Sequence, residues 1–179
     1  MNWGKITFVT TSLILLIGCS KPINNNSLVD RDGLKYQQDS QKPYSGKVFN
    51  FWDNGNMKLE GSYKDGLMNG KWTWYREDGK KMVKAYYVDG NGNGDKMIYE
   101  DLGIPRNGAD GELTFWNENG QKMYKGTFKD GEQDGKWTFW YENGQKKERG
   151  NFKNDKRIGE WTYYNDDGSI KEVKDFGDK

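Results

Sequence analysis

The sequence contains no histidine, a single cysteine and only three prolines among its 179 residues. Without histidine, catalytic triads with an imidazole base and metal sites with imidazole ligands are excluded. The 28 lysines and arginines nearly balance the 27 aspartates and glutamates, and both signs are mixed along the whole chain. Because no basic block is present, we expect no nucleic-acid partner.

No group of residues stands out as catalytic. The many glycines recur at turn spacing, and none of them forms a phosphate-binding loop in front of a helix. Carboxylate pairs such as Glu77 with Asp78 recur at equivalent turn positions, whereas a catalytic pair should be singular and sheltered. We therefore expect a protein that is not an enzyme and that uses no catalytic residue, no metal and no cofactor.

The first residues have the composition of an export signal. Lys5 supplies a positive charge, and Ile6 to Ile17 form an apolar run that is too short to span a bilayer stably. The run ends in LIGC, which resembles the lipobox of bacterial lipoproteins. That resemblance implies that residues 1–18 are removed as a signal peptide and that Cys19 is the site of lipid attachment.

The predicted location is therefore the bacterial cell envelope, with the chain exported and held by its lipid. The membrane would be the outer membrane where two membranes are present, and otherwise the outer face of the cell membrane. A plain signal peptide with an incidental cysteine is the alternative. Residues 19–32 are polar and predict a flexible tether, which leaves residues 33–179 as the folded domain.

A 24-residue repeat runs through this domain. The glycines at 46, 70, 111, 135 and 159 are each followed by another glycine nine residues later and by an aromatic residue seventeen residues later. The interval from 70 to 111 is longer, and it holds a second glycine pair at 94 and 103. The sequence therefore predicts units near 46–69, 70–93, 111–134, 135–158 and 159–179, with a shortened unit at 94–110.

Each unit has the pattern of a β-hairpin. Its front half alternates and is rich in Trp, Phe, Tyr and Thr, which favour strands. It ends in Asn-Gly or Asp-Gly, for which we predict a two-residue turn that leads into a second strand. Successive units should continue the sheet, so the predicted fold class is all-β, an elongated antiparallel meander of repeated hairpins. A capping strand is predicted near Leu34 to Gln38.

The two-residue turn also predicts which side chains share a face of the sheet. One face, the predicted core face, collects these large side chains from the first strands: Trp72, Trp74, Leu113, Phe115, Trp137, Phe139, Trp161 and Tyr163. The predicted opposite pairs are Trp72 with Ala85, Trp137 with Gly150 and Leu113 with Gly126. Such pairs resemble the arrangement in which a large side chain covers backbone that glycine leaves bare.

The opposite face carries threonines and charged residues and should be solvated. Its threonines are Thr73, Thr114, Thr138 and Thr162. One position on this face is nevertheless aromatic in all six first strands, and we call these residues the aromatic column: Phe51, Tyr75, Tyr99, Trp116, Trp140 and Tyr164. The rings either stiffen the sheet by packing on lysine and arginine stems, or they form a partner-binding surface.

The stretch DGNGNGDKMIYE at residues 89–100 satisfies the oxygen-ligand spacing of a calcium-binding loop. In the register of the repeat, the same residues form a turn between units followed by a strand. Lys96 would occupy the position at which a hydrophobic residue normally pins a calcium loop, and Glu100 would lie in the strand. We therefore predict a turn with no metal, and weak calcium binding remains the alternative.

The units GKWTFWYENGQKKERGNFKNDKRIG and GKWTWYREDGKKMVKAYYVDGNGNG resemble the bacterial variant of MORN repeats, and the resemblance covers about residues 33–179. It implies a hairpin-repeat fold. Proteins with such repeats include YwqK-family antitoxins and MORN-repeat lipoproteins, so a protein partner is implied, with a toxin as one alternative. The pattern G-x-W-x-x-x-Y also resembles the choline- or glucan-binding repeats of cell-wall proteins, although those units are usually shorter.

The predicted function is that of a membrane-anchored, non-enzymatic repeat lipoprotein that binds a protein partner through an extended aromatic-rich sheet face. Neutralisation of a toxin by an antitoxin or immunity-type protein is the first alternative. A cell-wall module that binds choline or glucan is the second.

Overall fold

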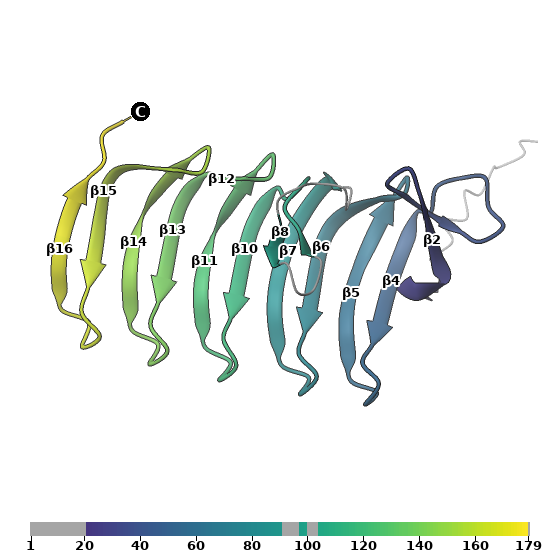
Figure 1. Ribbon diagram of the computed structural model, residues 1–179, viewed down its shortest axis with the longest axis horizontal. Coiled ribbons are helices and arrows are strands. Elements are labelled where there is room, and N and C mark those ends of the chain that lie inside the picture. Colours follow the sequence, from purple (N-terminus) through teal and green to yellow (C-terminus); the bar gives the residue numbers. More distant parts are fainter. Residues whose placement is uncertain (1–20, 91–96, 100–103, 179) are drawn as a thin grey trace, which may run out of the picture.

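The computed structural model describes residues 21–90, 97–99 and 104–178, with the side chains of 97–99 excepted. Its strands stand side by side in one long row, with the intra-hairpin turns along one edge of the row (Figure 1). The regular elements in the described residues are strands, apart from the 3₁₀ helix η1 (Asn25–Ser27). The all-β prediction is confirmed.

The main sheet has twelve strands, and the path through eleven of them runs β1-β4-β5-β6-β7-β10-β11-β13-β14-β15-β16, while β12 pairs with β11. Their bounds are β1 (Ile23–Asn24), β4 (Gly46–Phe51), β5 (Met57–Lys64), β6 (Leu67–Tyr75), β7 (Lys81–Gly90), β10 (Gly111–Trp116), β11 (Lys122–Lys129), β12 (Glu132–Gln133), β13 (Gly135–Trp140), β14 (Lys146–Lys153), β15 (Lys156–Tyr164) and β16 (Ile170–Asp175). Neighbours are antiparallel except β1, which is parallel to β4. The predicted meander of hairpins is therefore confirmed.

The first described strand, β1, begins at Ile23, before residue 32, where the tether was expected to end. After η1, β2 (Leu28–Arg31) and β3 (Leu34–Gln37) form a separate two-stranded sheet, and β3 lies where the capping strand was predicted. Leu28 is buried in the hydrophobic core and Ile23 packs against it. These two apolar side chains explain why a stretch that is mostly polar is nevertheless ordered.

The shortened unit at 94–110 differs from the expectation of a continuous meander. Its described strands, β8 (Met97–Tyr99) and β9 (Ile104–Pro105), pair with each other in a separate sheet, and the main sheet passes directly from β7 to β10. Ile104 is fully buried, and the Tyr87 hydroxyl donates to the Pro105 carbonyl over 2.6 Å. A second strand this short cannot complete a hairpin of the array, so the unit packs beside the main sheet instead.

The turns within the hairpins are three-residue loops, so the prediction of two-residue turns is wrong. In the first hairpin the Gly55 N–H donates to the Trp52 carbonyl, and the Trp52 N–H donates to the Asn56 carbonyl. The glycine has a φ of +86°, whereas Asn54 is not among the residues with positive φ. This is a type I turn followed by a left-handed glycine, for which Asn-Gly is equally suitable.

A β-bulge compensates for the extra loop residue in each of these hairpins. The register shifts by one residue just before the aromatic column, for example between Trp74 and Tyr75. Beyond the bulge the strands have the register that a two-residue turn would give. The predicted opposite pairs are therefore present: Trp72 with Ala85, Trp137 with Gly150 and Leu113 with Gly126.

The core face is closed by tryptophans that lie over glycines. A Cβ atom added to Gly126 would lie less than 3.0 Å from carbons of the Trp137 ring, and the Trp137 indole N–H donates to the Thr127 carbonyl over 3.1 Å. The same indole–glycine contact joins Trp72 to Gly61 and Trp161 to Gly150. The covered glycine belongs to the preceding unit, not to the opposite strand of the same hairpin as the sequence suggested.

The closing aromatic of each preceding unit completes this contact. Phe128 packs edge-on against the Trp137 ring, with centroids 5.3 Å apart, and the pairs Tyr63–Trp72 and Phe152–Trp161 have the same geometry. Such pairs add about 0.5–1.5 kcal/mol each beyond simple burial. The rings that reach from one hairpin to the next therefore add to the strand pairing that joins the units.

Candidate interaction surface

The aromatic column lies at the end of each first strand, directly before the turn. Phe51 is 47% exposed, Tyr75, Trp116 and Trp140 are half-buried, and Tyr164 is buried. The side chain of Tyr99 lies outside the described residues, and its strand β8 is not part of the main sheet. The structure therefore places five of the six predicted residues in one sheet and leaves their exposure graded from one end to the other.

Polar neighbours hold several of these rings. The Tyr75 hydroxyl donates to Glu60 Oε1 over 2.9 Å, and its pKa is raised to about 12 by burial first and then by the hydrogen bond and charge of Glu60. The Lys122 ammonium lies 5.9 Å from the Trp140 ring centroid, and the Arg149 guanidinium lies 5.8 Å from that of Tyr164. One ring of the column is thus held by a hydrogen bond, and two others have cations beside them.

This face is less solvated than the sequence suggested. Thr73 and Thr114 were expected in solvent, but both are buried. Lys84 lies between them in the sheet, opposite Thr73 on one side and opposite Thr114 on the other. Because long charged side chains lay their aliphatic stems over neighbouring residues, small threonines between them lose contact with water. Thr138 and Thr162 are half-buried.

A groove of about 880 Å³ is present at the N-terminal end of the column face. Its apolar lining includes Phe49, Phe51 and Met57, and the two phenylalanine rings lie 5.2 Å apart. Its charged residues are three lysines and one glutamate: Lys21, Lys47, Lys71 and Glu60. With three lysines and one glutamate, the groove combines exposed aromatic surface with an excess of positive charge.

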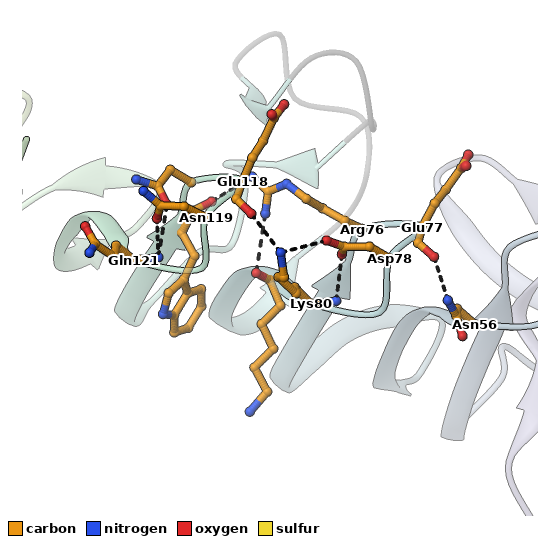
Figure 2. Close-up of polar contacts among 11 residues, drawn as sticks. Asn56, Arg76, Glu77, Asp78, Lys80, Glu118, Asn119 and Gln121 are labelled. Atoms are coloured by element: carbon orange, nitrogen blue, oxygen red, sulfur yellow. Dashed lines mark hydrogen bonds and ion pairs between the residues drawn. The ribbon is translucent and has the colours of Figure 1, made fainter. Parts of the chain in front are cut away.

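The turns beside the column are linked to one another, as Figure 2 shows for the turns that follow β4, β6 and β10. The side-chain amide of Asn56 donates to the Glu77 carbonyl over 2.6 Å, and the Lys80 ammonium reaches the Glu118 carbonyl over 3.2 Å. The Arg76 guanidinium donates to the Trp116 carbonyl over 2.7 Å. These bonds fix the spacing of neighbouring column residues, because each ring precedes a linked turn.

A family model for the MORN repeat variant matches four segments of the chain, residues 44–65, 68–89, 109–130 and 133–154. Each segment covers one hairpin of the main sheet. The first two segments begin 24 residues apart, and so do the last two. The chain is a MORN-repeat protein. The shortened unit lies in the interval between the second and third matched segments of this MORN-repeat protein. No curated protein matches the chain.

Sequence reasoning missed the residues that directly follow the column in this MORN-repeat protein. The Trp52 indole N–H donates to the Tyr75 carbonyl over 3.0 Å, and the Tyr141 hydroxyl donates to the Tyr164 carbonyl over 2.8 Å. Arg76 makes the same kind of bond to Trp116. The sequence does show a large side chain with a hydrogen-bond donor after the column residue in these units. It does not show that the acceptor is a backbone carbonyl of the next hairpin.

The turn predicted at residues 89–100, with weak calcium binding as its alternative, stays largely untested, because residues 91–96 and 100 lie outside the described residues. Within the described residues of the MORN-repeat protein, no cluster of three or more carboxylate, thiol or imidazole side chains could hold a metal ion. Among the same residues, none of the helices has the length and hydrophobicity that a membrane crossing requires. Cys19 also lies outside the described residues.

Proposed function

We propose that this MORN-repeat protein is a lipid-anchored, non-enzymatic binding protein that holds a protein partner on its column face. The observation that carries the proposal is the groove over β4 to β6, where Phe51 is 47% exposed beside Phe49 and Met57. Exposed aromatic surface of this kind is typical of the centre of a protein–protein interface.

The rigidity of the face supports the same conclusion. The column rings stand on paired strands, and the turns beside them are linked by side-chain hydrogen bonds to backbone carbonyls. A surface that is already ordered loses little conformational entropy when a partner binds. The face is therefore suited to binding an extended segment that crosses several hairpins.

The charge of the groove indicates the chemistry of the partner. Lys21, Lys47 and Lys71 surround the apolar lining, and Glu60 is engaged by Tyr75. An acidic segment with an apolar or aromatic side chain would place that side chain on Phe51 and its carboxylates beside the lysines. We therefore expect the partner to present such a segment.

The anchor would place this end of the sheet next to the membrane. Lys21 lines the groove and follows Cys19, the predicted lipid site, by two residues. With the chain exported and held in the cell envelope, the groove would lie close to the bilayer and the C-terminal hairpins farther away. The partner would then be an envelope protein or a protein that arrives from outside, such as a toxin.

The test is capture of partners from native membranes by the lipidated full chain, followed by mass spectrometry. We expect a partner whose capture falls at least tenfold with Phe51→Ala and with Trp140→Ala. Val88→Ala is the matched control, because Val88 is also an exposed apolar side chain, 55% exposed on β7, and it should leave capture unchanged.

Loss of capture with Val88→Ala as well, or no loss with the column variants, would contradict the proposal. A secreted toxin among the partners would make the protein an immunity-type antitoxin that uses the same face. Saturable binding of choline or glucan that is lost with Trp116→Ala and Trp140→Ala would instead establish a cell-wall module.

A further inference from the structure

The strand β16 forms an edge of the main sheet. It pairs with β15 on one side, and no described strand pairs with its other side. At the opposite end of the sheet, β1 covers part of β4. All six residues of β16 are exposed. Exposed edge strands offer unpaired backbone groups and are the usual sites of pairing between chains.

The backbone groups that face outward can be identified from the bonds to β15. The Phe176 N–H donates to the Gly159 carbonyl, so it points toward β15. Because successive residues of a strand direct their backbone groups to opposite sides, Val173 and Asp175 direct theirs toward the open edge. A new antiparallel strand would therefore form hydrogen-bonded pairs with these residues.

Apolar side chains concentrate on this edge. Of the six large apolar side chains that are well exposed in the described part of the chain, three lie at the end of the array: Ile170, Val173 and Phe176. Val173 is 53% exposed and lies on the column face, since it pairs with Thr162. A strand laid against β16 would remove this apolar surface from water.

The charges of β16 are self-complementary in one antiparallel register. If Val173 lies opposite Val173 of a second copy, then Glu172 lies opposite Lys174 on both sides of the centre, and Lys171 lies opposite Asp175. Glu172 and Lys174 share the core face, because they pair with Tyr163 and Trp161. Cross-strand pairs of opposite charge are stabilising, and like charges directly opposite are destabilising.

The neighbouring registers lack this complementarity. A pair centred on Glu172 would set two glutamates directly opposite each other, and a pair centred on Lys171 would set two lysines opposite each other. Lysines on an edge strand usually prevent pairing, but here each lysine meets an acidic residue in the Val173 register. The occupant that fits this edge is therefore a second copy of the same strand.

We propose that two copies of the chain associate through β16, antiparallel and centred on Val173, so that the two sheets continue as one. The two-fold axis is perpendicular to the sheet, and both column faces point the same way. The proposal does not depend on the partner proposed for the column face.

A cysteine at the centre of the pair tests the register directly. Hydrogen-bonded antiparallel pairs have Cα atoms about 5.5 Å apart, which is within the span of a disulfide. The lipidated full chain carrying Val173→Cys should form a covalent dimer under mild oxidation. Val88→Cys, exposed on an internal strand, should form none, and the unaltered chain controls for Cys19.

Charge reversal separates this pairing from unspecific cross-linking. In the Val173→Cys chain, Glu172→Lys sets a lysine at position 172 of each copy opposite Lys174 of the other copy. The two like-charge pairs should lower the dimer yield about tenfold. Adding Lys174→Glu restores both pairs and should restore the yield to within about threefold. Glu112→Lys, which reverses an exposed charge on β10, should have no effect.

The proposal is overturned if Val173→Cys cross-links no better than Val88→Cys, if Glu172→Lys has no effect, or if the double reversal fails to restore the dimer. It is also overturned if light scattering in detergent finds one copy per particle at every concentration. A dimer that is lost with Trp116→Ala but not with Glu172→Lys would assign self-association to the column face instead.

Discussion

The joints between hairpins are of two kinds, and the difference shows what the repeat requires. At three joints a tryptophan lies over a glycine of the preceding unit: Trp72 over Gly61, Trp137 over Gly126 and Trp161 over Gly150. At the joint between β7 and β10, where the shortened unit is set aside, the equivalent residues are Leu113 and Ala85, both buried. At this joint leucine replaces the larger tryptophan, and alanine replaces the smaller glycine.

The comparison shows that a joint needs a large residue matched to a small one more than it needs an indole. At the β7–β10 joint leucine faces alanine, and both are buried, so a smaller large residue leaves room for the Cβ atom that glycine lacks. The β7–β10 joint lacks the indole hydrogen bond of the other three. Like the other joints, it has side-chain bonds between its turns, here from Arg76 to the Trp116 carbonyl and from Lys80 to the Glu118 carbonyl.

Gly126→Ala should destabilise the sheet more than any other single substitution proposed for these joints. The added methyl group would lie within the Trp137 ring, and the ring is held by its bond to Thr127 and by Phe128. Overpacking at such a site should lower the free energy of unfolding by about 3 kcal/mol. Denaturant titration followed by circular dichroism and by tryptophan fluorescence measures the loss.

The double variant Gly126→Ala with Trp137→Leu converts this joint into the β7–β10 type. It should recover at least half of the stability that Gly126→Ala loses, since the smaller leucine does not overlap the added methyl group as the indole ring does. Ala85→Gly is the matched control at the other joint and should cost about 1 kcal/mol, mainly through chain entropy. If the double variant is less stable than Gly126→Ala alone, leucine with alanine cannot replace tryptophan with glycine at this joint.

Arg157→Ala tests the last indole–glycine joint, in which Trp161 is fully buried. The Arg157 guanidinium lies 3.9 Å from the Trp161 ring centroid and binds Glu148 through both of its terminal nitrogens. Its removal exposes the ring and leaves a half-buried carboxylate without this partner, so we expect a loss of about 2 kcal/mol. Lys156→Ala, on the exposed side of the same strand, should cost less than about 0.5 kcal/mol.

Arg76→Met tests the other kind of joint. It keeps an aliphatic stem but removes the donor to the Trp116 carbonyl, and we expect a loss of about 1–2 kcal/mol in the free energy of unfolding. Lys80→Met removes the longer and more exposed bond to Glu118 and should cost less than about 1 kcal/mol. Equal losses for the two variants in thermal or denaturant unfolding would show that the turn bonds do not carry this joint.

The repeat itself could be predicted because it depends on local sequence patterns. The spacing of glycines fixes the hairpins, and the alternation of large and small residues fixes the faces, so the pairs Trp72–Ala85 and Trp137–Gly150 were correct. Even the wrong turn type did not disturb them. A three-residue loop followed by a one-residue bulge gives the strands the same register as a two-residue turn.

What could not be predicted depends on contacts between units. The sequence places Trp137 on a face, but it does not say whether the ring leans toward Gly150 in its own hairpin or toward Gly126 in the preceding one. It suggests a hairpin at 94–110, yet the short second strand at Ile104 and Pro105 leaves that unit outside the sheet. The bonds by which Arg76 and Trp52 link neighbouring turns could not be predicted either, because their acceptors lie in the next hairpin.

The smallest expected effect concerns the closing tyrosines of the two kinds of joint. Tyr63 packs on Trp72 at an indole–glycine joint, and Tyr87 lies at the β7–β10 joint. Burial raises the pKa of both hydroxyls above the ordinary value of 10.0, with a smaller contribution from Asp30 at Tyr63. Both groups therefore stay protonated in the folded chain at a pH where they ionise in the unfolded chain.

The sign of the pH dependence follows from proton binding. Above about pH 10 the unfolded chain binds fewer protons than the folded one, so the free energy of unfolding falls as pH rises, by up to about 1.4 kcal/mol per pH unit for each such tyrosine. Below pH 10 the contribution is fully present. Tyr63→Phe and Tyr87→Phe should each make this alkaline decline shallower when denaturant titrations are compared from pH 8 to pH 11.

At pH 8 the two variants should differ. Tyr87→Phe loses the 2.6 Å hydrogen bond to the Pro105 carbonyl and should cost about 1 kcal/mol, whereas Tyr63→Phe keeps its ring on Trp72 and should change the stability little. The bond of Tyr87 links the main sheet to the shortened unit, so its loss would show how strongly that unit is held. Equal stabilities of the two variants at pH 8 would mean that the β7–β10 joint does not depend on the shortened unit beside it.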